Sequence, residues 1–150
     1  MKRFIGAALA AVITVGASAA TAEDAHTWTT EDTFDNVTFA VQNAIIGAGL
    51  VVDHVSHTGD MLERTKDAVG STKTLFTGAD VFSFCSAQTS REVMEADITN
   101  FQYCPYTIFV YQTPEDTDHV TVGFRSYDEE SMQPVTNMLT GIVKDALMLD

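Results

Sequence analysis

The stretch that decides the fold is Phe82–Tyr106, FSFCSAQTSREVMEADITNFQYCPY, which holds both cysteines of the 150-residue chain, Cys85 and Cys104. Runs typical of β-strands flank it, so we expect one thiol at the beginning and the other at the end of the segment that connects two strands. If the flanking strands are antiparallel neighbours, the thiols meet at one end of the sheet. If they are parallel, the thiols lie roughly 17–20 Å apart and cannot bond. The 19-residue separation is short for a full crossover helix, which favours the antiparallel case.

The first 22 residues have the organisation of a secretory signal peptide. Lys2 and Arg3 precede an apolar run over 4–15, and a small-x-small pattern ends at Ala22. The apolar run is shorter than the about 20 residues that span a bilayer. We therefore predict cleavage near Ala22 and a periplasmic or secreted protein with no membrane insertion afterwards. An uncleaved anchor is the alternative.

The processed chain would be strongly acidic. Loss of the leader would leave six basic against 21 acidic residues, a net charge of −15. Such a surface repels phosphates, so nucleic acid is not expected as a partner. Solubility explains the charge, and an acidic docking face for a basic partner is the alternative. The remaining length fits an acidic tether over 23–33 and one domain over 34–150.

Hydrophobic periodicity predicts helices alternating with strands. The first helix begins at an Asp35 cap and ends at Gly49. The last helix starts near Asp128 or Ser131, or as late as Pro134. Helices scattered around such strands predict an α+β fold, two-layered, with a largely antiparallel sheet packed by helices. The other predicted elements are a short strand ending near Phe34, strands over 50–57 and 80–86, helices over 60–69 and 89–96, and a hairpin of 106–112 with 119–127.

Two segments resemble exported members of the domain-of-unknown-function family numbered 302. They are FCSAQTSREVMEADITNFQYCPYTIFVY, with Cys85, Cys104 and Pro105, and HVSHTGDMLERT over 54–65. The resemblance covers roughly 34–127. It implies a fold like the TATA-box-binding-protein-like α+β domain, without DNA binding and without an established activity.

The two cysteines have three interpretations. An exported compartment favours a disulfide, which would contribute about 3 kcal/mol by closing the loop between Cys85 and Cys104. A redox-active or ligand-binding pair is the second interpretation, although the wide spacing is unlike Cys-x-x-Cys. Two unpaired thiols are the third.

A soft-metal site is an alternative use of the same thiols. Thiolate and thioether ligands select Cu(I), and imidazole suits copper or haem iron. The spacing is not that of a tight metal motif, and strand histidines and helix methionines have commoner structural uses. The candidate ligands for copper or haem are His54, His57, Met61, Cys85, Met94 and Cys104.

Arg91 and Arg125 could clamp a small anion, and His54 and His57 are further ligand-binding candidates. The alternative for Arg91 is a surface ion pair with Glu95. The sequence has neither a GxSxG elbow nor a glycine-rich phosphate loop, so an enzyme is not favoured. We expect a non-catalytic domain that binds a small molecule or a periplasmic protein. The rivals are a soft-metal or haem-handling protein and a thiol redox enzyme, and a homodimer through a sheet edge or the last helix is a further expectation.

Overall fold

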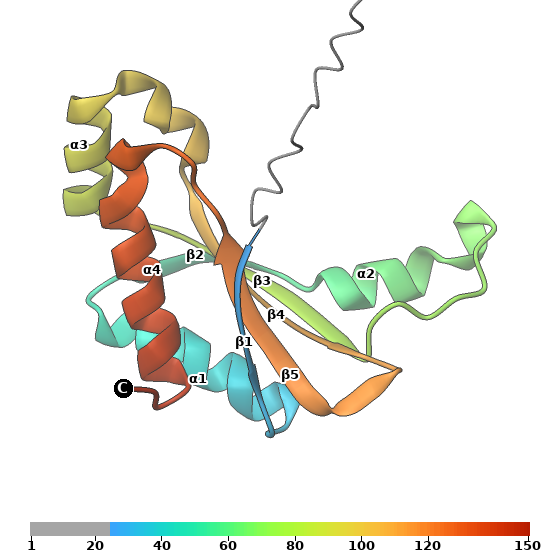
Figure 1. The fold of residues 1–150 in the computed structure, drawn as a ribbon. Helices are drawn as coiled ribbons and strands as arrows, with labels where there is room; N and C mark the ends of the chain where they lie inside the picture. The colour runs from blue at the N-terminus through green and yellow to red at the C-terminus, as the bar shows by residue number, and fades with distance from the viewer. Residues whose placement is uncertain (1–24) are drawn as a thin grey trace, which may run out of the picture.

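The computed structural model describes residues 25–150, and the predicted leader lies outside them. In this part of the chain an antiparallel sheet is packed by helices (Figure 1). The elements are β1 (Ala25–Thr30), α1 (Phe34–Gly47), β2 (Val51–Ser56), α2 (Thr58–Thr65), η1 (Asp67–Val69), β3 (Gly78–Cys85), α3 (Ala87–Ala96), η2 (Ile98–Tyr103), β4 (Tyr106–Thr113), β5 (Asp116–Arg125), η3 (Glu130–Met132) and α4 (Gln133–Ala146).

The sheet has the strand order β1-β5-β4-β3-β2, and every neighbouring pair is antiparallel. The predicted α+β class with a largely antiparallel sheet is therefore confirmed. β3 and β4 pair with Phe84 opposite Tyr106, so the antiparallel expectation for the strands beside the two cysteines is also confirmed.

The prediction of an acidic tether over 23–33, leading into a short strand that ends near Phe34, needs correction, because the first strand ends at Thr30. Residues 25–30 form β1, which pairs with β5 along its whole length and is an edge of the sheet. Trp28 lies opposite Val122, and its ring centroid is 5.8 Å from that of Phe124. The domain thus begins before residue 34. A strand this short is stabilised by a partner distant in the chain, which local composition does not reveal.

Helix ends differ from the predictions by a few residues. The cap of α1 is Thr33 rather than Asp35, and the Thr33 hydroxyl accepts a hydrogen bond from the Asn36 amide at 3.3 Å. Gly49 follows α1 with φ 78°, a left-handed conformation that suits glycine. The helix predicted over 60–69 is divided into α2 and η1. α4 begins at Gln133, close to the latest predicted start, with proline in its first turn.

The core lies between the sheet and three helices. Figure 1 shows α1, α3 and α4 on one side of the sheet, while α2 projects from the body as an arm. We define the arm as residues 58–77. None of the described helices is long and apolar enough to cross a membrane. The fully buried strand residues alternate and face these three helices: Phe84, Tyr106, Ile108, Val110, Val120, Val122 and Phe124.

Candidate functional sites

The two cysteines lie together at one end of β3 and β4, and both are free thiols in this structure. Burial, followed by a hydrogen bond with the Cys104 thiol, raises the pKa of Cys85 to about 12. Only the thiolate is a nucleophile, so a pKa this high leaves Cys85 almost unreactive near neutral pH. The raised pKa therefore does not favour Cys85 as a nucleophile.

Arg125 lies near the cysteines, among tyrosines. Its guanidinium carbon is 5.6 Å from the ring centroid of Tyr103, and the Tyr103 ring meets Tyr127 edge-on at 5.3 Å. Burial raises the pKa of Tyr127 to about 12. The arginine thus packs on an aromatic ring, and it lines none of the hollows described below.

Arg91 forms a surface ion pair with Glu95, which was the alternative to its predicted role in clamping an anion. Its Nε lies 3.3 Å from a carboxylate oxygen of Glu95 one helical turn away, and both side chains are about 70% exposed (72% and 70%). Such a pair contributes less than about 1 kcal/mol. In this structure Arg91 is therefore part of a solvated face of α3.

The six residues of the predicted copper or haem site do not converge. His57 Nδ1 is 2.8 Å from Asp80 Oδ1, and Asp80 lies five residues before Cys85, about 17 Å along an extended strand. His54 is exposed on β2, opposite Ser83. Met61 belongs to the arm, and Met94 packs against the core. Among residues 25–150, no group of three or more His, Cys, Asp or Glu side chains could hold a metal ion.

The His57–Asp80 pair borders a hollow of about 430 Å³ between α1 and the β2–β3 pair. Phe39, which is 68% exposed, and Asp35 line its other side. The predicted ligand residue His57 therefore lies at a surface hollow, while its companion His54 does not line it.

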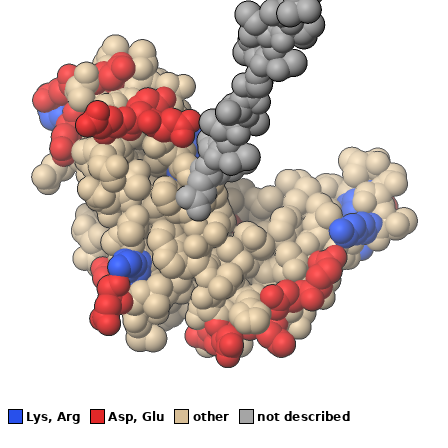
Figure 2. Space-filling model, viewed as in Figure 1, with Lys and Arg blue, Asp and Glu red and all other residues tan. Residues whose placement is uncertain are grey.

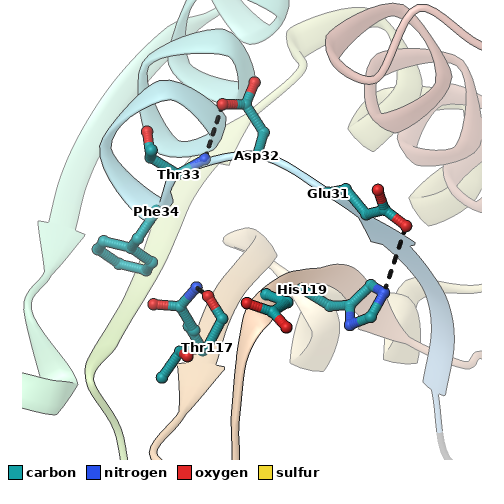
Figure 3. Close-up of a pocket in the computed structure, with 8 residues that line it drawn as sticks. Glu31, Asp32, Thr33, Phe34, Thr117 and His119 are labelled. Carbon is teal, nitrogen blue, oxygen red and sulfur yellow. Dashed lines mark hydrogen bonds and ion pairs between the residues drawn. The ribbon is translucent and has the colours of Figure 1, made fainter.

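An acidic cleft lies between the β1–α1 connection and the start of β5 (Figure 3). Its volume is about 670 Å³. His119 lies between two carboxylates: its Nδ1 is 2.9 Å from Asp116, and its Nε2 is 3.8 Å from Glu31. The hydrogen bond with Asp116 raises the pKa of His119. The lining residues are Glu31, Asp32, Thr33, Phe34, Gln112, Thr117, Asp118 and His119.

This cleft suits a cation more than an anion, because carboxylates reach it from both walls and Phe34 offers a ring face. However, the Glu31 side chain is 85% exposed, and pairing with such a carboxylate is worth little in water. Sequence analysis missed the cleft because residues 31–34 and 117–119 are brought together only by the pairing of β1 with β5.

A smaller, mostly apolar pocket of about 290 Å³ lies within the arm. After η1, Gly70 turns the chain with φ 74°, and the Ser71 amide donates to the Lys66 carbonyl at 2.9 Å. Lys66 Nζ also donates to Thr74 Oγ1 at 3.4 Å. The segment 71–76 is thereby held back against α2 and encloses the pocket. Its lining residues are Gly59, Met61, Leu62, Glu63, Thr65, Lys66, Val69, Ser71, Lys73, Leu75 and Phe76.

Five large apolar side chains line this pocket: Met61, Leu62, Val69, Leu75 and Phe76. Three of them are exposed to solvent: Met61 is 41%, Leu75 46% and Val69 77% exposed. A surface that leaves apolar groups in water around a cavity gains free energy when an apolar ligand covers them. The signal in the sequence that could have revealed this pocket is the adjacent apolar pair Leu75 and Phe76. It lies in the segment 72–78, for which no helix or strand was predicted.

The architecture defines a class: a small α+β domain with an antiparallel sheet covered by helices on one face. Among solved structures, the chain is similar to the crystal structure of an uncharacterized conserved protein DUF302 from Bacillus stearothermophilus. The TM-score is 0.57 at 12% identity, covering 85% of this chain and 90% of that one. The resemblance to family 302 is thus confirmed at the level of the fold. Neither a family model nor a curated protein matches the chain.

Proposed function

We propose that this chain is an exported, non-catalytic binding domain that takes a small, largely apolar molecule with one anionic group into the arm pocket. The observation that carries the proposal is the apolar lining of that pocket. The acidic cleft is larger, but it has only Phe34 as an apolar side chain and lies open to solvent. Binding sites for small molecules are mostly apolar, with few polar groups that fix orientation.

The anionic group is assigned from the two lysines of the pocket. The Lys66 ammonium already donates hydrogen bonds to Glu63 and to Thr74. Lys73 is 68% exposed and lies 3.7 Å from Glu115, a pair that contributes less than about 1 kcal/mol. A ligand carboxylate or sulfonate can displace Glu115 from Lys73 at that small cost. Lys73 therefore orients the ligand, while the apolar walls supply most of the affinity.

A matched pair of variants tests the proposal. Ser71 lines the pocket, whereas its neighbour Thr72 is exposed and does not. Ser71→Phe should fill the pocket and abolish binding of the fluorescent probe anilinonaphthalene sulfonate, and Thr72→Phe should retain it. Octanoate should displace the probe from the wild type. Lys73→Gln should weaken probe binding about three- to fivefold, since an exposed charge pair is worth under about 1 kcal/mol.

Equal probe binding by Ser71→Phe and the wild type would refute the arm pocket as the site. Circular dichroism of both phenylalanine variants controls for folding. Loss of binding in both variants, with folding intact, would also count against the pocket, because Thr72 lies outside it.

We further propose that the Cys85 and Cys104 thiols form a disulfide once the chain is exported. Their position at adjacent ends of β3 and β4, and their mutual hydrogen bond, support the pairing. An oxidising compartment converts such neighbouring thiols to a disulfide. The bond would fasten the connection through α3 and η2 to the sheet.

A further inference from the structure

We propose that the uncovered face of the sheet is the interface of a homodimer, in which two copies pack sheet against sheet. This inference is independent of the arm pocket. Because α1, α3 and α4 all pack on one face, most of the alternate strand residues on the other face have no helix over them (Figure 1). The exception is Ala79 in β3, which is buried against Gly59 at the start of α2. We call this other face the open face. From β1 to β3 its residues include Thr27, Thr29, Thr121, Gly123, Thr107, Phe109, Tyr111, Val81, Ser83 and Cys85.

The centre of the open face carries no carboxylate in a chain with 21 acidic residues. The charged groups on this side lie toward its margins, such as Asp53 of β2, whose charge adds to the effect of burial in raising the pKa of Cys85, and Arg125 at the end of β5. Within β1, β3, β4 and residues 119–125 of β5, the only carboxylate is Asp80. Asp80 pairs with buried Val110 and lines the hollow beside α1, so it lies on the covered face. Figure 2 shows carboxylates gathered over α3 and in a band along the lower edge toward the arm, while the surface above that band, between the body and the arm, is largely tan.

This charge distribution favours a second copy as the partner. Two copies with a net charge of −13 or more negative repel each other wherever acidic surfaces meet. The centre of the open face is where two copies can approach without opposing carboxylates. A twofold axis through it makes an isologous contact, in which each residue meets the same surface of its partner.

The centre of the open face has the composition of a contact surface. Phe109 and Tyr111 lie 6.1 Å apart by ring centroid, and Phe76 of the arm meets Tyr111 edge-on at 5.8 Å. The Phe109 ring lies over Gly123, where a Cβ atom would be 2.7 Å from Phe109 Cζ. Aromatic side chains surrounded by uncharged polar residues are typical of interface centres.

The open face supplies most, but not all, of the area that a stable dimer needs. Five strands about 4.8 Å apart, with a rise of about 3.3 Å per residue, make a face of roughly 600 Å². A stable interface needs about 800 Å² per partner. The base of the arm, which touches the face through Phe76 and Tyr111, can supply the remainder. Sheets that pack face to face lie about 10 Å apart, a spacing that threonine and aromatic side chains fill.

The test is the oligomeric state of the purified protein, measured by light scattering after size exclusion at about 10 μM, above a micromolar Kd. The wild type should be a dimer. Thr107→Glu, at the centre of the open face, and Thr27→Glu, at its exposed margin, should each raise the dimer Kd at least tenfold. Asn43→Glu adds the same charge to an exposed position of α1 and should leave the dimer intact.

A monomeric wild type at about 100 μM, a concentration at which even weak dimers form, would overturn the proposal. So would a dimer that resists both open-face variants, because its interface would lie elsewhere. Dissociation by Asn43→Glu to the same degree would show a general charge effect and also overturn it. Thr27 is exposed, so its variant keeps the test valid if Thr107→Glu does not fold.

Discussion

Reduction of a Cys85–Cys104 bond should lower the free energy of unfolding by about 3 kcal/mol. The bond would close a loop of 20 residues through α3 and η2. The folded loop is already held in place, for example by the buried Asn100 amide, which donates to the Val93 carbonyl at 2.8 Å. The bond therefore acts mainly on the unfolded chain, and a loop of this length gives about 3 kcal/mol in the chain-entropy account.

Urea unfolding with and without dithiothreitol measures this difference. A slope of about 1–3 kcal/mol per M urea converts 3 kcal/mol into a midpoint shift of roughly 1–3 M. Cys104→Ser provides the control: dithiothreitol should not move its midpoint, and that midpoint should lie near that of the reduced wild type. A difference between the two would report the cost of the serine itself.

Intact-mass analysis of protein recovered from the periplasm gives the covalent state directly. We expect a chain that begins at Glu23 and lacks the two thiol hydrogens. Two titratable thiols in that protein would refute the bond, and so would equal midpoints with and without reductant. A mass that retains Met1 would refute the predicted cleavage.

Two further predictions concern packing and protonation. Gly123→Ala should destabilise the fold by about 1–3 kcal/mol, because the added methyl would meet Phe109 and the His26 carbonyl. Gly141→Ala, in α4 with open space around it, should stabilise by about 0.5–1 kcal/mol, so equal urea midpoints for the two variants would contradict the packing. NMR titration should place the pKa of His119 above its usual 6.5, and Asp116→Asn should lower it. Because the pKa of His119 is raised in the folded state, the small stabilisation from its pair with Asp116 is present below about pH 6.5 and is lost as pH rises through the folded pKa. An unchanged His119 pKa in Asp116→Asn would contradict the role of Asp116.

Local pattern identified most of the elements. The apolar spacing from Val37 to Ile45 predicted α1, and alternation around Val122 predicted β5. The strands beside Cys85 and Cys104 were expected to be antiparallel neighbours, as the β3–β4 register shows. These predictions succeeded because helical and strand periodicities depend on residues close together in the chain.

Local pattern failed where the partner is distant. The first strand was predicted to end near Phe34, with a tether before it, whereas β1 ends at Thr30 and takes up most of that tether. The six residues around Trp28 form a strand through pairing with β5. The acidic cleft at His119 depends on the same pairing. The candidate copper or haem ligands do not come together, because His57 pairs with Asp80 near the start of β3, whereas Cys85 ends that strand. Composition does not reveal this separation.

By itself, the sequence determined the acidic charge, predicted the α+β class and favoured the antiparallel connection that brings Cys85 and Cys104 together. Only the tertiary structure decided that α1, α3 and α4 pack on one face of the sheet, that the centre of the other face carries no carboxylate, and that the arm folds back around an apolar pocket. The reason is physical: periodicity and charge belong to neighbouring residues, whereas strand order and cavities arise from contacts between segments far apart in the chain.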